Sequence, residues 1–543
     1  MAGLALAPVQ ASARLNGDDF ARTYVQARAA AMNGDHAQAA QLLATLASSQ
    51  PDQTDLAKKA LSEALGAGRM DLALSLARSI PAAKLPTDAR LMLVVDEVKR
   101  RRPDPALQWL AISADNGDLS FLAPLITAWD AADRGNADQA LNTIDQIPVG
   151  SLLDPLRAEE RALILLKYRR TAEAEPFARR AIGSAGARED RLRLALADGF
   201  LAAGDKARAL TMLDGMGGEA AAARQRIEAG KLSGQAIDNS AKAFSEVLTA
   251  FAADLARLQR ATPPIGLVQV ARYASSQNSS ATALLAVLLD AQRQPDAALA
   301  LLKTIPPTDG LASQVRDVQV RILSDEKRYN DAYQIAATAA ALPTAGAADY
   351  SRLGDLYSAM KRSSAAADAY GRAVAMSGTR GQKDDLWTLQ LLRASALQDA
   401  NRWPEAKQAL QEGLAIAPDQ PLLLNFLGYA KLERGEDVDA AEAMIRKASE
   451  LSPDNASIVD SLGWAQFKRG KTGDAIETLQ RAAEKDPDQA EIQEHLGDAL
   501  YKSGRRYEAR FAWSAALITG QDEIATRVKA KLASGLTPAN AAP

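Results

Sequence analysis

Three stretches near the end of the chain repeat one pattern: LGYAKLERGEDVDAAEAMIRKA (residues 427–448), LGWAQFKRGKTGDAIETLQRA (462–482) and LGDALYKSGRRYEARFAWSAA (496–516). Each starts with Leu-Gly, and the glycines are spaced by 35 and 34 residues. An alanine follows the glycine after 12 or 13 residues, and a second alanine comes 7 residues later. Because several residue types keep one register, the pattern predicts a repeated structural unit.

The residue types in the pattern predict that each unit is a pair of antiparallel helices. Glycine and alanine at fixed positions allow two helix backbones to approach closely where they cross. Turns such as Arg469-Gly470-Lys471 separate the two helices, and glycine adopts the left-handed angles that such turns need. Prolines at 418, 453 and 487 end the units, since proline cannot donate the next helical hydrogen bond. The pattern resembles the tetratricopeptide repeat, whose unit is a helical hairpin.

The same register extends toward the N-terminus. The small residue of the second helix recurs at Ala39, Ala73, Ala106, Ala140, Ala174, Ala209, Ala298, Ala332, Ala366, Ala406, Ala441, Ala475 and Ala509, which gives thirteen units. Residues 241–275 suggest a fourteenth, divergent unit. We therefore expect an all-α fold, a right-handed α-solenoid of about 14 helical hairpins with a C-terminal capping helix. In such an array neighbouring hairpins contact each other locally, and there is no central core.

The register and the composition divide the chain into six parts. We expect a remnant of an export signal (1–13), an N-terminal repeat array (14–216), an irregular insertion or hinge (217–240), a C-terminal repeat array (241–517), a capping helix (518–533) and a disordered tail (534–543).

Composition excludes several classes of function. The 543 residues contain 64 Lys+Arg and 67 Asp+Glu, and a net charge of −3 argues against nucleic-acid binding. The chain has no cysteine and only two histidines, so thiolate chemistry and a multi-histidine metal site are excluded. No apolar run approaches the ~20 residues needed to span a bilayer.

The first thirteen residues, MAGLALAPVQASA, are small, apolar and uncharged, and they end in Ala-Ser-Ala. This ending fits a secretory cleavage site, although a positively charged start is missing. We favour the tail of an export signal that begins upstream of Met1; the alternative is an alanine-rich cytoplasmic N-terminus.

No catalytic motif emerges from the sequence. Gly470-Lys471-Thr472 looks like part of a phosphate loop, but six residues instead of four separate Gly470 from Gly463, and no strand precedes them. His36 lies in a turn, and His495 has neither a nucleophile nor a second histidine near it in sequence. We therefore expect no enzyme activity, no cofactor and no metal site.

The first helices of the last three units carry a candidate partner-binding stripe. First helices line the concave face of such solenoids, where peptides commonly dock. The stripe mixes hydrogen-bonding and aromatic side chains, as anchoring surfaces do; it comprises Asn425, Tyr429, Asp460, Trp464, Glu494, His495 and Asp498. The alternative is that Tyr429 and Trp464 pack between units.

The stretches Asn425–Tyr429, Pro453–Trp464, His495–Asp498 and Ala509–Trp513 resemble bacterial envelope tetratricopeptide proteins, with a likeness over about residues 240–517. That group includes outer-membrane lipoproteins that bring cell-wall hydrolases to periplasmic carboxy-terminal processing proteases. The resemblance implies a non-enzymatic adaptor that is periplasmic or outer-membrane associated, with the protease and its substrates as protein partners. The chain lacks the cysteine that carries the lipid in those lipoproteins. The alternative is a cytoplasmic scaffold or assembly factor for another complex.

Overall fold

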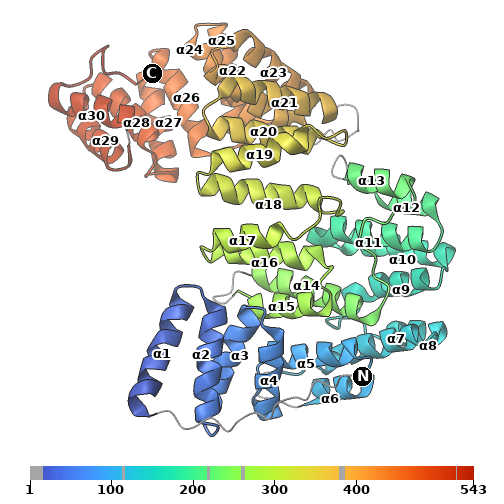
Figure 1. The fold of residues 1–543 in the computed structure, drawn as a ribbon. Helices are drawn as coiled ribbons and strands as arrows, with labels where there is room; N and C mark the ends of the chain where they lie inside the picture. Colours follow the sequence, from blue (N-terminus) through green and yellow to red (C-terminus); the bar gives the residue numbers. More distant parts are fainter. Residues whose placement is uncertain are drawn as a thin grey trace. The chain divides into compact units, whose positions relative to one another are not determined.

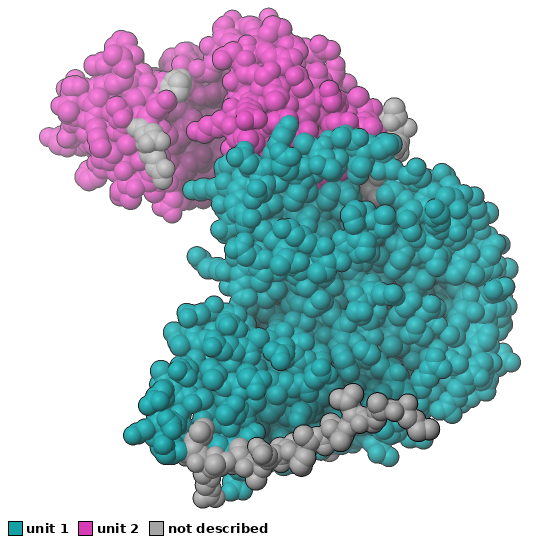
Figure 2. Space-filling view, in the orientation of Figure 1, with its two compact units in different colours: residues 1–345 teal, residues 346–543 magenta. Residues whose placement is uncertain are grey.

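The computed structural model describes residues 16–112, 117–216, 220–258, 263–377, 386–520 and 522–542. These residues form thirty α-helices and four short 3-10 helices, with no strand among them (Figure 1). The chain packs as two compact units, residues 1–345 and 346–543 (Figure 2). The predicted all-α fold of stacked helical hairpins is confirmed.

Unit 1 contains nineteen helices in its described residues. They are α1 (Gly17–Met32), α2 (His36–Ser49), α3 (Thr54–Gly66), α4 (Met70–Ser79), α5 (Thr87–Lys99), α6 (Pro103–Ala111), α7 (Ala123–Asp133), α8 (Ala137–Asp145), α9 (Arg157–Lys167), α10 (Thr171–Ser184), α11 (Glu189–Ala202), α12 (Lys206–Met212), α13 (Ala221–Glu228), α14 (Ser240–Arg257), α15 (Ile265–Ala274), α16 (Ser279–Ala291), α17 (Pro295–Leu302), α18 (Ala312–Asp325) and α19 (Tyr329–Ala340).

Unit 2 contains eleven helices in its described residues. They are α20 (Ala347–Ala359), α21 (Ser363–Ser377), α22 (Leu386–Asp399), α23 (Trp403–Ile416), α24 (Pro421–Glu433), α25 (Val438–Leu451), α26 (Ala456–Lys468), α27 (Thr472–Lys485), α28 (Ala490–Lys502), α29 (Arg506–Thr519) and α30 (Asp522–Ser534).

Thirteen hairpins share one turn geometry. In each turn a residue with a positive φ angle reverses the chain between the two helices: Gly34, Gly68, Arg101, Gly135, Arg169, Gly204, Arg293, Lys327, Lys361, Asn401, Gly435, Gly470 and Gly504. The φ angles of the non-glycine members are 56–60°. The turn of Gly435 has a second residue with a positive φ angle, Asp437, at 44°. A side chain in this region costs roughly 1–2 kcal/mol, so packing of the flanking helices holds those turns in place.

Close helix crossings explain the glycines of the Leu-Gly pairs. A Cβ atom added to Gly428 would lie 2.8 Å from the carbonyl oxygen of Ala441, and one added to Gly463 would lie 2.6 Å from Cγ of Leu479. Ala441 is fully buried. The prediction that small residues mark the crossing of the two helices is thus confirmed at these positions.

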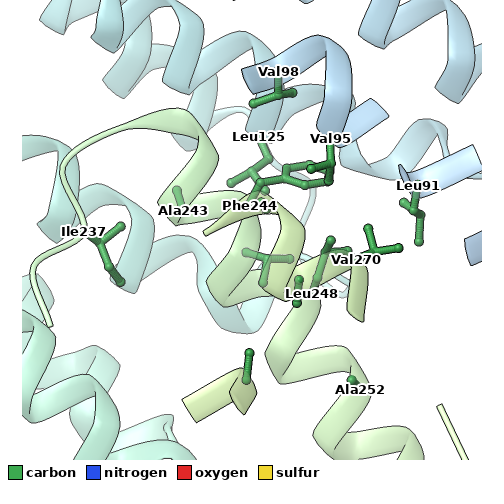
Figure 3. Packing of buried hydrophobic residues seen from close by; sticks show 14 of the residues in the cluster. Leu91, Val95, Val98, Leu125, Ile237, Ala243, Phe244, Leu248, Ala252 and Val270 are labelled. Atoms are coloured by element: carbon green, nitrogen blue, oxygen red, sulfur yellow. The ribbon is translucent and has the colours of Figure 1, made fainter. Parts of the chain in front are cut away.

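Unit 1 departs from a chain of purely local contacts. Helices α14 and α15 pack against α3, α5 and α7, which are earlier in the chain by more than a hundred residues (Figure 1). Figure 3 shows Phe244 of α14 among Val95 and Val98 of α5 and Leu125 of α7. One buried apolar cluster therefore extends from residue 27 to residue 311. The expectation that the array has no central core is wrong for this unit, because the divergent hairpin α14–α15 supplies one.

Polar contacts fix the same hairpin. The Nζ atom of Lys99 donates to the carbonyl oxygen of Tyr273 at 2.5 Å and lies 3.8 Å from the centre of its ring. The hydroxyl of Tyr273 donates to Asp96 at 2.9 Å, and burial followed by this bond raises the pKa of Tyr273 to about 12. Gln269 donates to the carbonyl of Gly66 at 3.1 Å. These bonds tie α15 to α3 and α5 at specific points.

The boundary between the compact units lies at 345/346, whereas the sequence suggested a hinge at 217–240. Residues 217–219 lie outside the described part of the chain. Residues 231–239 form an irregular connection within unit 1 and are hydrogen-bonded to its helices. The hinge at 217–240 stays a prediction, which limited proteolysis would test.

The C-terminal end of unit 2 is closed by α30, which corresponds to the predicted capping helix. The residues after it were expected to be disordered, yet they are packed as far as residue 542. Asn540 and Ala542 are buried, and the backbone N–H of Ala542 donates to Asp498 at 3.0 Å. Through this bond the last described residues cover Asp498 of α28, which α30 also contacts through Lys531. The predicted export-signal remnant, residues 1–13, lies outside the described residues.

Candidate functional site

A helix face in unit 1 holds a non-helical segment of the chain, residues 231–239, through its backbone. Asp198, on α11, is fully buried and accepts hydrogen bonds from the backbone N–H groups of Ser233 and Gln235, both at 2.7 Å. The two donors flank Gly234, whose φ angle of 90° bends the backbone between them. The carboxylate of Asp198 therefore recognises main chain and not side chain.

Neighbouring first helices continue this contact. Arg191 of α11 donates to the carbonyl of Gln235 at 3.2 Å, and Lys167 of α9 donates to the carbonyl of Asp238 at 2.6 Å. Asp133 of α7 accepts from the backbone N–H of Ser240 at 3.1 Å. Three successive first helices thus present acidic and basic groups to the donors and acceptors of one backbone segment, which is the chemistry of peptide binding in a groove.

Buried charges lie beside this segment. Arg188, which directly precedes α11, forms an ion pair with Glu159 of α9 at 3.0 Å. Arg191 of α11 pairs with Glu246 of α14, also at 3.0 Å. Burial raises the pKa of Glu159 even though Arg188 opposes the effect. Such pairs are costly to desolvate, so they are stable only because each carboxylate has a close cation or hydrogen-bond donor.

Glu160, the next residue of α9, forms no ion pair among the described residues. Its carboxylate accepts the indole N–H of Trp129 at 2.6 Å, and both side chains are buried. Burial, followed by the neighbouring charge of Glu159, raises the pKa of Glu160 to about 8. This carboxyl group is therefore largely protonated at neutral pH.

A cavity of about 390 Å³ opens between α14, α16, α18 and the start of α11. Its apolar wall includes Leu284 and Val287 of α16 and Val315 and Val318 of α18. These pairs are spaced by three residues, so each lies on one face of its helix. The wall is large enough to take an aliphatic side chain.

The polar side of the cavity is formed by α11. Gln314 of α18 donates to Asp190 at 3.2 Å, and burial, followed by the charge of Glu189, raises the pKa of Asp190. Arg191, which also contacts residues 231–239, lines the cavity. Its Nε atom is buried and has no hydrogen-bond partner among the described residues. The cavity therefore combines an apolar wall with the charged groups of the Arg191–Glu246 ion pair.

The stripe predicted from the last three units is placed differently. Trp464 is 1% exposed and stacks on His495 with ring centres 4.1 Å apart. Asp460 lies 2.9 Å from Nδ1 of His495. Burial by itself would lower the pKa of His495, but the charge and hydrogen bond of Asp460 outweigh it and raise the pKa. Trp464 of α26 therefore packs against the next repeat within unit 2, and the side chains of Asp460, Trp464 and His495 are all buried.

Glu494 and Asp498 are also used inside unit 2. Both contact the Nζ atom of Lys531 of the capping helix at 2.7 Å, and Glu494 also pairs with Arg527 at 2.7 Å. Asp498 further accepts the indole N–H of Trp513 at 2.9 Å. In this structure both carboxylates are satisfied by the chain and are closed off from solvent.

Asn425 and Tyr429 of α24 remain half-buried. Asn425 donates to the hydroxyl of Ser461 at 3.2 Å, and burial raises the pKa of Tyr429. These two are therefore the members of the predicted stripe that retain exposed area. The sequence did not point to Asp198, Lys167 or Arg191, because their partners lie 35 to 71 residues further along the chain.

Comparison with known families agrees with the repeat register. Residues 391–456 match a model described as tetratricopeptide repeat, and residues 463–504 match a model described as TPR repeat. This part of the chain carries tetratricopeptide repeats. No curated protein matches the chain.

Several solved structures are similar to the chain or to parts of it. A tetratricopeptide repeat protein from Parabacteroides merdae is 13% identical, and the match covers 46% of this chain and 94% of that one with a TM-score of 0.38. A chain of the APC/C hetero-tetramer Cut9–Hcn1 is 14% identical over 95% and 96% of the two chains, with a TM-score of 0.37. YrrB, described as a TPR protein with an unusual peptide-binding site, is 18% identical over 36% and 97%, with a TM-score of 0.27.

Two further findings concern the described residues only. Within them, no helix combines the length and apolar character that crossing a membrane requires. The same residues hold no group of three or more histidine, aspartate or glutamate side chains arranged to bind a metal ion.

Proposed function

We propose that this repeat protein is a non-enzymatic scaffold that binds extended segments of partner proteins. The observation that carries the proposal is the backbone contact of α7, α9 and α11 with residues 233–240. A helix face that satisfies the main chain of one non-helical segment has the donors and acceptors needed to satisfy another.

The cavity bounded by α14, α16 and α18 is the place in unit 1 where a partner segment would bind. It is open, whereas the face of α7–α11 is already covered by the chain itself. An aliphatic side chain would pack on Leu284, Val287 and Val318.

We further propose that the scaffold is a periplasmic adaptor that brings substrates such as cell-wall hydrolases to a carboxy-terminal processing protease. The likeness of residues 240–517 to envelope tetratricopeptide proteins supports this role. The chain has two separately packed units, and two surfaces on one chain allow two partners to be held together. Such an arrangement raises the effective concentration of the substrate near the protease. The alternative is a cytoplasmic scaffold for another complex.

Affinity capture from crosslinked cells tests the adaptor role. The gene is expressed with its natural upstream DNA, and captured proteins are identified by mass spectrometry. We expect a processing protease together with cell-wall hydrolases, and the purified chain should then accelerate cleavage of the hydrolase by the protease. Recovery of cytoplasmic complexes alone would contradict both the adaptor role and export.

A cavity-filling variant tests the binding site. Ala253, on α14, lines the cavity, and Ala253→Trp would occupy the space that the partner segment needs. Ala359→Trp is the matched control because Ala359 is an exposed helical alanine in unit 2. We expect Ala253→Trp to reduce partner capture at least tenfold while far-UV circular dichroism stays unchanged. Equal capture by both variants would place the binding site elsewhere.

A further inference from the structure

The outer face of α29 carries three exposed apolar side chains. Tyr507 is 85% exposed, Phe511 is 77% exposed and Ile518 is 84% exposed. At 3.6 residues per turn their directions fall within about 40° of one another around the helix. They therefore form one narrow stripe along α29 and are not scattered surface residues.

The stripe plays no part in the packing of the repeat. The opposite side of α29 is the one that packs, through Ala509, Ala512, Trp513 and Ala516, all of which are buried. Side chains that lined a hollow would be half-covered by their neighbours, whereas these three are almost fully open to solvent. They project from the surface as a ridge. A contiguous exposed apolar patch marks an interaction surface more often than an accident of sequence.

Unneutralised cations lie beside the ridge. Lys502, Arg506 and Arg510 are exposed, and among the described residues none has a carboxylate within ion-pair distance. Arg506 lies over the ring of Tyr501, and Arg510 donates to the carbonyl of Leu532 at 2.7 Å. From Lys502 to Ile518 the one acidic residue is Glu508, which pairs with Arg505. Between Lys502 and Ile518, basic side chains therefore outnumber acidic ones, and the net charge of this stretch is positive.

Aromatic and aliphatic side chains that protrude among basic groups match an anionic lipid surface. Tyrosine and phenylalanine enter the headgroup region readily, and lysine and arginine are attracted to anionic lipids beside them. A protein partner would instead have to supply a hollow that fits a ridge and enough surrounding contact for a stable interface. Charge complementarity thus favours the lipid surface.

We propose that the stripe Tyr507, Phe511 and Ile518, with Lys502, Arg506 and Arg510, binds the chain peripherally to an anionic membrane surface. This inference is independent of the proposed partner-binding cavity, since the two surfaces belong to different compact units. Capture of protein partners and binding to vesicles can therefore fail separately.

Vesicle co-sedimentation of the full chain tests the proposal. The probes are vesicles of phosphatidylcholine alone and vesicles that also contain about one third phosphatidylglycerol. We expect binding to the anionic vesicles, little binding to the neutral ones, and weaker binding at high salt. Phe511→Ser/Ile518→Ser should lower the partition coefficient at least tenfold. Lys502→Gln/Arg506→Gln should lower it and also reduce its salt dependence.

Val149→Ser/Leu152→Ser is the matched control, because these apolar side chains of unit 1 are 84% and 65% exposed. It should bind vesicles like the unchanged chain. All variants alter exposed side chains, so their melting curves should coincide. Failure of the unchanged chain to bind anionic vesicles would overturn the proposal, and so would equal binding by the Phe511/Ile518 variant. A third outcome also overturns the proposal: the unchanged chain does not bind vesicles, but it sediments as a dimer without lipid, and the Phe511/Ile518 variant sediments as a monomer. That outcome would assign the stripe to contact with a second copy of the chain.

Discussion

Removing the amine of Lys531 should strongly destabilise the C-terminal end of unit 2. This side chain is fully buried, and its Nζ atom lies 2.7 Å from both Glu494 and Asp498. In Lys531→Met the apolar stem is kept but the cation is lost. Glu494 retains Arg527, whereas Asp498 retains only neutral donors, including the indole N–H of Trp513. Leaving a buried carboxylate without its cation costs about 3–5 kcal/mol of unfolding free energy.

The loss should depend on pH. Burial already raises the pKa of Asp498 although Lys531 opposes the rise, and removal of Lys531 raises the pKa further. Between the ordinary pKa of Asp498 in the unfolded chain and its raised pKa in the folded variant, the folded variant holds a proton that the unfolded chain has released. The unfolding free energy of the variant therefore falls as pH rises through that range. Lys531→Met should therefore be less harmful at pH 5 than at pH 8. Adding Asp498→Asn should recover part of the loss at pH 8.

Urea unfolding followed by tryptophan fluorescence measures this effect, since Trp513 contacts Asp498 directly. Lys529→Met is the matched control, because Lys529 is an exposed lysine on the same helix. We expect the control to change the unfolding free energy by less than about 0.5 kcal/mol. A loss below about 1 kcal/mol in Lys531→Met, or a loss that is the same at both pH values, would refute the reasoning.

Three other substitutions test packing, titration and turn geometry. Gly463→Ala should destabilise the chain by about 1–3 kcal/mol in urea unfolding, because its Cβ would lie 2.6 Å from Leu479, while Gly473→Ala, with open space around it, should stabilise slightly. In the unchanged chain the raised pKa of Glu160, about 8, makes the unfolding free energy fall by roughly 3–4 kcal/mol between pH 5 and pH 8, at about 1.4 kcal/mol per pH unit. Glu160→Gln should remove this fall, and identical pH profiles of the two chains would count against the reasoning. Lys361→Gly should raise the unfolding free energy by up to about 1 kcal/mol in thermal melts, because φ is 57° there, whereas Lys361→Ala should not.

The repeat register was predictable because it depends on local packing. Gly463 and Ala475 mark the helix crossing in the sequence, and the structure places both there. The turns were harder to recognise, because Arg101 and Lys361 occupy the turn position where other repeats have glycine. A positive φ angle at such residues is imposed by the two flanking helices, so composition gives little sign of it.

The packing of the hairpin α14–α15 on α5 and α7, and the burial of most of the predicted partner-binding stripe in unit 2, could not be predicted from the repeat register. Phe244 looks like an ordinary apolar residue of an amphipathic helix, and nothing local indicates that its partners are on α5 and α7. Glu494 and Asp498 look like exposed groove residues until Lys531 is placed beside them. In both cases the residues that bury the side chain are distant in sequence, and the 34-residue period of the repeat does not indicate which residues they are.

The return of α14 and α15 onto α3, α5 and α7 has a consequence for folding. The bond from Lys99 to Tyr273 spans 174 residues, and that from Gln269 to Gly66 spans 203, so unit 1 has a high contact order for a repeat protein. During synthesis at roughly 5–20 residues per second, its first hairpins emerge many seconds before the hairpin that covers them. During that time the apolar side chains of Val95 and Leu125 lack the contact with α14 that buries them in the folded chain. A ribosome-bound chain that ends before residue 240 is therefore expected to bind chaperones. The C-terminal repeats, with their nearest-neighbour contacts, carry no such delay.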